Sequence, residues 1–147
     1  MTRINLVRPD ELYDQHLFAE FREIKMVPKS LARSLAAAER RGAVFPVDWV
    51  LARIPKEFTL NTGHVSFFYD KGLYLTIRYA KLCSELERRG YNFDKMARFD
   101  PDGVFERDPR LFHNYLPTPE AIDIIEKRIA EKVALKPEWY RYTGERP

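Results

Sequence analysis

The stretch from Leu73 to Arg89 constrains the fold of this chain most, because its apolar residues recur with the period of an α-helix. The predicted apolar stripe consists of Leu75, Tyr79, Leu82 and Leu86. Gly90 follows at the position where helices commonly end. Cys83 lies beside the stripe, and we interpret it as a small buried hydrophobe rather than a nucleophile. A helix with one apolar stripe must bury it against other elements, so the chain has to supply partners for it.

A second long helix is predicted from Pro119 to Leu135, near the end of the chain. Thr118 is a typical N-cap, and Pro119 suits the first helical position. Pro137 lies just beyond the predicted end. The residues expected to point inward are Ile122, Ile125, Ile129 and Val133. Those expected on the more solvent-exposed sides are Lys127, Arg128 and Lys132.

The third predicted helix opens the chain and is interrupted. Asp10 is its expected N-cap, and Pro28 should end or kink it near Met26. A further helical run is predicted from Lys29 to Arg41, closed by Gly42. The core stripe of the first part is expected to be Tyr13, Leu17, Phe21 and Ile24.

The remaining segments have no clear helical period. We expect residues 42–63 to form a loop with short extended pieces, and residues 91–117 to be irregular. The irregular segment is either functional or packed onto the core through Phe93, Phe99, Phe105 and Phe112. The triplet Phe67-Phe68-Tyr69 is expected in the core rather than stacked on bases. The sequence therefore predicts an all-α fold, one compact domain over residues 1–147 with three main helices and long irregular loops.

Composition excludes several classes of protein. With 45% hydrophobic residues among 147, the chain can bury a core, and a net charge of +3 permits a nucleic-acid partner without requiring one. Its single cysteine excludes an internal disulfide and a cysteine-based metal cluster. His64 and His113 lack partners at ligand spacing, so we expect no metal and no other cofactor. No apolar run approaches a membrane span and no export signal is visible, so we expect a cytoplasmic monomer that does not contact membranes.

The polar face of the first helix gathers side chains that could do chemistry. On a helical projection this face holds Gln15, His16, Ala19, Arg22 and Glu23. A solvated face usually scatters lysines and glutamates, whereas this one combines a carboxylate, a guanidinium, an amide and an imidazole. An ordinary solvated face remains the alternative interpretation.

The N-terminus favours the chemical interpretation. Thr2 is small, so we expect Met1 to be removed and Thr2 to carry a free α-amine. Such an amine has a pKa of about 7.7–8.0, against about 10.4 for lysine, so a useful fraction is unprotonated at neutral pH. It is therefore a ready nucleophile for a carbonyl-like carbon, and a nearby carboxylate such as Glu23 could manage the protons.

Several segments resemble one family from end to end. The matching segments are Thr2-Arg3-Ile4-Asn5-Leu6, Asp14-Gln15-His16-Leu17, Ala19-Glu20-Phe21-Arg22-Glu23, Gly63-His64-Val65-Ser66-Phe67-Phe68-Tyr69-Asp70-Lys71, Arg88-Arg89-Gly90-Tyr91-Asn92 and Pro137-Glu138-Trp139-Tyr140-Arg141-Tyr142. Together they resemble the phage endonuclease V type of pyrimidine-dimer DNA glycosylase. The resemblance implies that the N-terminal segment threads between the first and last long helices, which would bring the Thr2 amine to Glu23.

The resemblance also implies an activity, a partner and a set of roles. The activity is a combined DNA glycosylase and abasic-site lyase reaction in DNA repair, acting on double-stranded DNA with cyclobutane pyrimidine dimers. Thr2 would be the nucleophile, and Glu23 would orient the deoxyribose and handle protons. The positions matching DNA-contacting residues of the family are Arg3, Gln15, His16, Arg22, Arg128 and Lys132, together with the tail residues Trp139, Tyr140 and Arg141.

The chain departs from the family pattern at one place. Lys25 and Met26 stand where the family has a proline followed by an arginine. Lys25 can replace the charge of the missing phosphate clamp but not its forked geometry. Another damaged base or an abasic site is therefore an alternative substrate. A DNA- or RNA-binding module without catalysis is the alternative from another class.

For the tail, two interpretations are open. Trp139 and Tyr140 either contact the lesion or are buried rings that pin the tail onto the first helix. The aromatic and basic mixture at this place is typical of stacking and phosphate contact.

Overall fold

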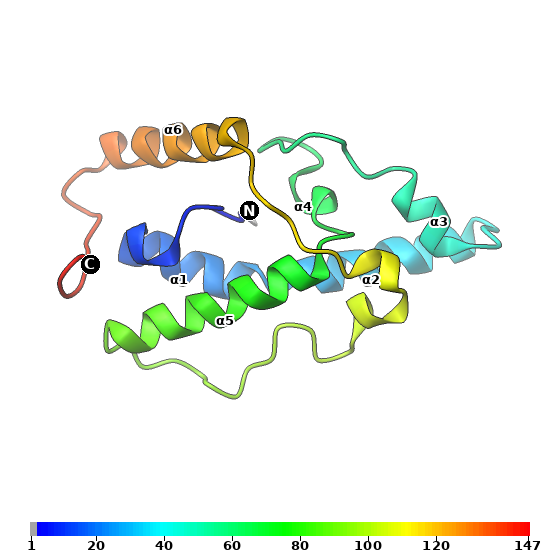
Figure 1. Ribbon diagram of the computed structural model, residues 1–147, viewed down its shortest axis with the longest axis horizontal. Coiled ribbons are helices and arrows are strands. Elements are labelled where there is room, and N and C mark those ends of the chain that lie inside the picture. Colours follow the sequence, from blue (N-terminus) through cyan, green and yellow to red (C-terminus); the bar gives the residue numbers. More distant parts are fainter. Residues whose placement is uncertain (1–2) are drawn as a thin grey trace.

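The computed structural model describes residues 3–147, which fold into helices joined by loops (Figure 1). In chain order the elements are the 3₁₀ helix η1 (Pro9–Glu11), α1 (Asp14–Glu23), α2 (Met26–Arg40), α3 (Pro46–Leu51), α4 (His64–Phe67), α5 (Gly72–Arg88), the 3₁₀ helices η2 (Val104–Arg107) and η3 (Pro109–Leu111), and α6 (Pro119–Leu135). Within residues 3–147 no strand forms, although Lys71 and Phe112 make an isolated antiparallel bridge. The predicted all-α class is confirmed.

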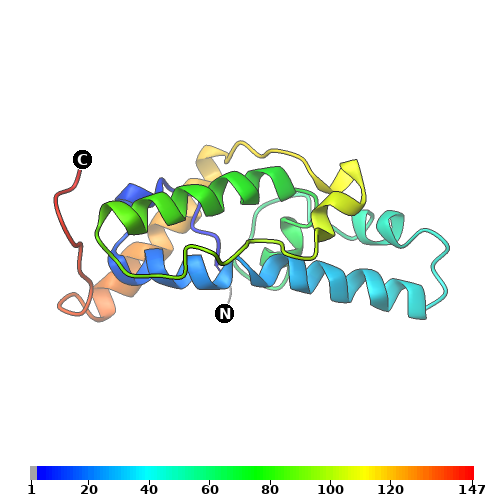
Figure 2. The ribbon, with the colours of Figure 1, turned by 90° about the horizontal axis from the view of Figure 1, so that it is seen from below.

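Three long helical units set the architecture. Helices α1 and α2 follow one another nearly end to end, and α5 lies beside α1 (Figures 1 and 2). Helix α6 lies on the other side of α1, and the N-terminal segment passes between them (Figure 1). The predicted threading is therefore present from Arg3 onward.

The predicted interruption of the first helix is present, and its position is displaced. The break lies at Ile24 and Lys25, and Pro28 sits in the first turn of α2 rather than ahead of it. Pro28 has no N–H to offer the carbonyl of Ile24, which instead accepts a bond of 3.1 Å from the Val27 N–H. The second run thus starts at Met26, not at Lys29.

The predicted N-cap of the first helix is wrong. Asp10 lies in η1, and its carboxylate pairs with Arg8 instead of capping a helix, at 2.6 Å from Nη2. Helix α1 begins four residues later, and no side chain caps its N-terminus. Pro9 begins only the short 3₁₀ helix η1. The helical period counted from Leu12 therefore began too early, because α1 starts at Asp14.

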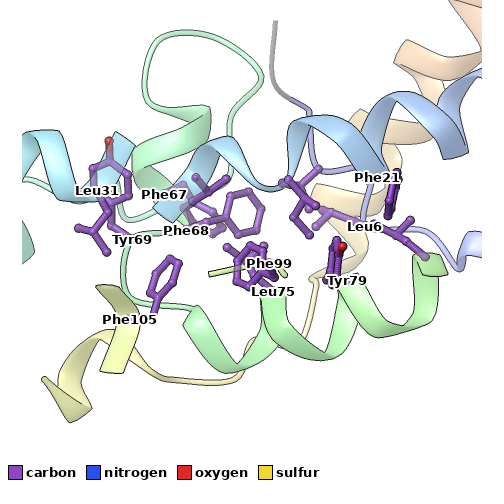
Figure 3. Close-up of a cluster of buried hydrophobic side chains, with 14 of the residues drawn as sticks. Leu6, Phe21, Leu31, Phe67, Phe68, Tyr69, Leu75, Tyr79, Phe99 and Phe105 are labelled. Atoms are coloured by element: carbon purple, nitrogen blue, oxygen red, sulfur yellow. The ribbon is translucent and has the colours of Figure 1, made fainter. Parts of the chain in front are cut away.

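Helix α5 is confirmed within one residue, and its four predicted stripe residues are buried. Its first residue must be glycine, because a Cβ at Gly72 would lie 2.7 Å from the ring and Cβ of Phe105. Figure 3 shows buried hydrophobic side chains, most of them aromatic, that lie at this helix: Phe68, Leu75, Tyr79, Phe99 and Phe105. The Phe67-Phe68-Tyr69 triplet is in the core, as expected.

The segments without a helical period contain more helix than expected. Residues 46–51 form α3, which packs on α2, so the prediction of a loop with extended pieces over residues 42–63 is wrong. Pro46 occupies the first helical position, where its missing N–H costs nothing. Residues 91–117 are mostly irregular, and they pack onto the core: Phe99 and Phe105 are buried, while Phe93 and Phe112 are half-buried.

Helix α6 has the predicted bounds, and the Thr118 hydroxyl accepts a hydrogen bond from the Ala121 N–H at 3.1 Å. Its burial is shallower than predicted. Ile125 is fully buried, whereas Ile122, Ile129 and Val133 are only half-buried. The helix rests on the narrow N-terminal segment rather than on a full helical face, so less of its stripe is covered (Figure 1).

Candidate active site and nucleic-acid interface

The N-terminal segment is held inside the protein rather than on its surface. Ile4, Asn5 and Leu6 are all buried. The Ile4 N–H donates to Nε2 of His64 at 2.9 Å, and Nδ1 of the same ring lies 2.8 Å from the Thr59 carbonyl oxygen. Because Nε2 accepts, the proton must be on Nδ1, which donates to Thr59. His64 is therefore a neutral structural clamp, and burial, followed by the neighbouring charges of Arg3 and Arg128, lowers its pKa to about 4.

A buried ion pair forms the second clamp. Oε1 of Glu20 accepts from the backbone N–H of Asn5 at 3.0 Å and from its Nδ2 at 2.9 Å. The same carboxylate pairs with Arg78 of α5 through Nε and through Nη2, the latter at 3.0 Å. Arg78 also donates from Nη1 to the Val7 carbonyl at 2.8 Å. Both side chains are almost completely buried, so this pair fixes the segment between α1 and α5.

The backbone turns sharply where these clamps meet. Leu6 has a φ of +57°, the left-handed region that residues other than glycine rarely adopt. Such a conformation costs on the order of 1 kcal/mol and persists only when neighbours determine it. Here Asn5 and Val7 on either side are hydrogen-bonded to Glu20 and Arg78. The path of residues 4–7 is thus imposed by tertiary contacts.

This path brings the start of the segment to Glu23. The backbone nitrogen of Arg3 lies 3.3 Å from Oε2 of Glu23, and the two groups are half-buried. Burial, together with the charge of Arg128, lowers the pKa of Arg3, while Glu23 partly offsets this effect. Thr2, the predicted nucleophile, lies outside the described residues.

His16 lies at the edge of the same cluster and connects it to the tail. Its ring stacks on Tyr140, with centroids 4.8 Å apart and planes inclined by 19°. Burial and the charge of Arg128 lower the pKa of His16, which favours the neutral imidazole. Nδ1 of His16 is buried and has no hydrogen-bond partner among residues 3–147. The structure therefore brings Arg3, His16, Glu23 and Arg128 together.

Gln15 has a structural role that the sequence did not predict. Its Nε2 donates to the Trp139 carbonyl at 2.5 Å, and its Oε1 accepts from the Arg141 N–H at 3.1 Å. The amide thus holds the tail backbone on both sides of Tyr140. The Asp14 N–H adds a bond of 2.8 Å to the Arg141 carbonyl.

Asp14 completes the attachment of the tail. Its buried carboxylate accepts from the Thr143 N–H at 3.1 Å, from the Thr143 hydroxyl, and from the Tyr91 hydroxyl at 2.9 Å. Arg89 pairs with it at 2.8 Å. Burial alone would raise the pKa of Asp14, but these hydrogen bonds outweigh it and hold the pKa below its usual value. The tail is consequently a fixed part of the site.

The attached tail presents Trp139 to solvent. Its side chain is 54% exposed, so it is not a buried anchor; Tyr140 takes that place against Tyr13 and His16. Trp139 and Arg141 line a surface pocket of about 330 Å³, together with Arg22, Phe18 and Tyr91. Flat aromatic walls and two guanidinium groups suit the aromatic and anionic parts of a nucleic acid.

The other predicted site residues include Lys25 and Lys132. The ammonium group of Lys25 sits over the ring of Phe21, 4.1 Å from its centroid, and the residue lines a different pocket with Lys29 and Arg98. Lys132 is exposed on α6, and among residues 3–147 no hydrogen bond or ion pair joins it to Glu23.

The residues that sequence reasoning missed are Asp14, Glu20, His64 and Arg78. All four are buried polar groups whose partners come from distant parts of the chain. Glu20 and Arg78 are 58 positions apart, so no local pattern could reveal their pairing. Within the described residues no group of three or more histidine, cysteine or acidic side chains is arranged to hold a metal ion. None of the described helices has the length and apolar character needed to cross a membrane.

Comparison with known families gives a match. The family model described as pyrimidine dimer DNA glycosylase matches residues 1–99 of this chain. The matched part contains Glu23 and the clamps formed by His64, Glu20 and Arg78, whereas α6 and the tail lie beyond it.

Proposed function

Because the chain belongs to the pyrimidine dimer DNA glycosylase family, we propose that it is a bifunctional DNA glycosylase and abasic-site lyase. The α-amine of Thr2 attacks C1′ of the deoxyribose at the 5′ pyrimidine of the dimer. The bond from C1′ to the base breaks, and the base leaves with the bonding electrons and takes up a proton. Opening of the sugar gives a Schiff base with Thr2. Loss of a proton from C2′ then expels the 3′ phosphate, which breaks the strand.

The observation that carries this proposal is the distance of 3.3 Å between the Arg3 nitrogen and Oε2 of Glu23. The α-amine of Thr2 is separated from that nitrogen by three covalent bonds. By bond geometry the two nitrogens are never more than about 4 Å apart. A carboxylate beside the Arg3 nitrogen is therefore within reach of the amine that would attack.

Glu23 supplies what the amine chemistry needs. As a carboxylate it can accept a proton from the attacking amine, and it stabilises the positive charge that develops on the sugar and the Schiff base. His64 and Glu20 hold the N-terminal segment at a fixed distance from α1, which carries Glu23. These contacts support the proposed role of Glu23. A nucleophile on a fixed segment needs little reorganisation before attack.

The cations around Glu23 are suited to phosphate. The charge of Arg128 disfavours the charge of Arg3, so an anion bound between the two side chains would relieve that repulsion. Arg22 and Arg141 are exposed at the pocket beside Trp139. We propose that these residues, together with Lys25 and Lys132, contact the DNA backbone.

The tail is the proposed lesion-recognition element. Trp139 is exposed on a backbone that Gln15 and Asp14 hold in place, so its ring can stack on a distorted base step without further ordering. The stacked rings of Tyr140 and His16 then support the tail next to Trp139. We expect Gln15 to contribute by holding the tail in place as well as by contacting DNA.

The range of lesions is a separate question. Lys25 is directed onto the ring of Phe21, so it is a weaker substitute for the phosphate clamp that it replaces. Abasic sites make smaller demands on such a clamp, and we expect them to be processed at least as well as dimers.

Strand cleavage distinguishes this function from the alternative of a binding module. The purified protein should incise a duplex with one cyclobutane dimer and a duplex with one abasic site, and it should leave the undamaged duplex intact. Because the amine performs the chemistry, we expect cleavage to continue in EDTA. Lesion binding without any incision would instead support a non-catalytic module.

A further inference from the structure

A line of cations extends away from the site along α1 and α2. Arg22, Lys29, Arg33 and Arg40 are spaced by seven, four and seven residues, and all four are exposed. At about 100° per residue, these spacings place the four side chains within roughly 20° of one line. The helical path is nearly continuous across the break, because Ile24 and Lys25 both keep right-handed helical dihedrals.

We call these four cations the α2 track. No acidic neighbour neutralises them within the described residues. Among residues 3–147, none of them forms an ion pair with a carboxylate. The guanidinium of Arg22 lies 5.6 Å from the ring centre of Phe18, which leaves its hydrogen-bond donors available. An uncompensated row of positive charge on a rigid rod attracts a linear polyanion.

The far end of the track carries exposed apolar side chains. Val44 and Phe45, which join α2 to α3, are 82% and 68% exposed. The backbone at Phe45 is nevertheless fixed, because it caps α3 and its carbonyl accepts from the Trp49 N–H at 3.1 Å. Arg53 stacks on Trp49 at 3.6 Å, which adds a further cation to this tip.

We propose that the α2 track and the Phe45 tip bind the DNA duplex on one side of the lesion only. This inference rests on the proposed function, which places the lesion at Glu23. From Arg22 to Arg40 the rod extends about 27 Å at 1.5 Å per residue. That length corresponds to about eight base pairs at 3.4 Å each. Phosphates of the flanking duplex contact the track, and Phe45 meets the groove beyond them as an apolar wedge between arginines.

The one-sidedness follows from the architecture. Helix α2 leaves Glu23 in one direction, whereas the opposite end of α1 is covered by the tail (Figures 1 and 2). DNA flanking the lesion on the α2 side therefore gains a second set of contacts. The matched cation and apolar residue elsewhere are Lys81, exposed on α5, and Leu116, 88% exposed ahead of α6.

Binding to duplexes of different length tests the inference. The probe is a duplex containing a tetrahydrofuran abasic-site analogue, which the amine chemistry does not cleave. One version has long flanks on both sides, and two versions are shortened to about four base pairs on one side or the other. Wild type, Arg33→Gln and Phe45→Ala are compared with the controls Lys81→Gln and Leu116→Ala.

We expect shortening of one flank, and not the other, to weaken wild-type binding. Arg33→Gln should lower the slope of log K against log salt by about one unit, only on duplexes that keep that flank. Phe45→Ala should weaken binding to the same duplexes by about fivefold or more. Both controls should bind like wild type.

Two results overturn the inference, and they are distinguishable. If wild type prefers the lesion duplex but neither flank length nor the two variants matter, the track does not bind DNA and the proposed function stands. If wild type binds lesion and undamaged duplexes equally and incises neither a dimer nor an abasic duplex, the proposed function fails and the one-sided track fails with it.

Discussion

The backbone nitrogen of Arg3 and the carboxylate of Glu23 lie 3.3 Å apart, although 20 positions separate the two residues in the chain. Glu20 and His64 hold the intervening segment through its buried N–H groups. Several buried polar groups thus fix the position of residues 4–7 relative to α1. The proposed amine chemistry requires a segment that is held in this way.

The first prediction concerns proton handling by Glu23. Glu23→Gln keeps the size of the side chain and an acceptor for the Arg3 N–H, but it removes the charge and the proton acceptor. We expect single-turnover cleavage of a dimer duplex to slow by about 100-fold or more. Lesion binding should be largely retained. A parallel loss of binding and turnover would instead identify Glu23 as a structural residue.

The second prediction concerns the buried pair of Glu20 and Arg78. Glu20→Gln leaves the guanidinium of Arg78 buried without its counter-charge. We expect the free energy of unfolding to fall by about 3–5 kcal/mol, measured by urea denaturation. Glu39→Gln, an exposed change on α2, is the control and should have little effect. A loss below about 1 kcal/mol at Glu20 would contradict the role of this clamp.

The third prediction concerns the pH dependence of stability. Burial lowers the pKa of His64 to about 4 from an ordinary value of 6.5. Between these two values the unfolded chain binds the proton and the folded protein does not. The free energy of unfolding should therefore fall as pH falls from about 6.5 to about 4, by up to about 3 kcal/mol.

A variant isolates this titration. His64→Gln has no group that titrates in this window, and its amide can still accept from Ile4 and donate to Thr59. Its stability should therefore change less with pH over this window than that of wild type. His113→Gln, at an exposed histidine, should keep the wild-type dependence. Identical pH profiles for His64→Gln and wild type would contradict the assignment.

The fourth prediction concerns the tail. Trp139 is exposed, so Trp139→Ala should change stability by less than about 0.5 kcal/mol. It should reduce the discrimination between damaged and intact DNA by about 1–3 kcal/mol, with the salt dependence unchanged because no charge is lost. If Gln15 acts by holding the tail, Gln15→Leu should reduce the same ratio, and the double variant should lose little more.

The opposite pattern would identify the ring as a packing element. In that case Trp139→Ala would lower the melting temperature while the ratio of affinities stayed constant. Additive losses in the double variant would assign Gln15 a separate contact with DNA.

The sequence predicted those parts of the fold that local patterns encode. Helices α5 and α6 were predicted within one residue, because a strong apolar period and clear end signals coincide there. The period from Leu12 onward did not reveal that η1 precedes α1, and α3 was too short to show a period at all.

The candidate site likewise contains residues that the sequence indicated and residues that only tertiary contacts explain. The polar face of α1 and the family resemblance pointed to Glu23, and the structure places the Arg3 nitrogen beside it, with the charge of Arg128 acting on both Arg3 and His16. Glu20 resembles any other charged residue of that helix, and only its distant partner Arg78 explains its burial. For Gln15 the resemblance implied a contact with DNA, which stays a prediction, and the sequence did not show that its amide binds the tail, 124 positions away.

Borohydride trapping tests the central claim most directly. The protein is incubated with a dimer-containing duplex and sodium borohydride, and the trapped peptide is identified by mass spectrometry. We predict a reduced adduct at the α-amine of Thr2 in protein that lacks Met1, and no adduct in protein that retains Met1. Full activity with Met1 in place, or an adduct on a lysine such as Lys25, would contradict the claim.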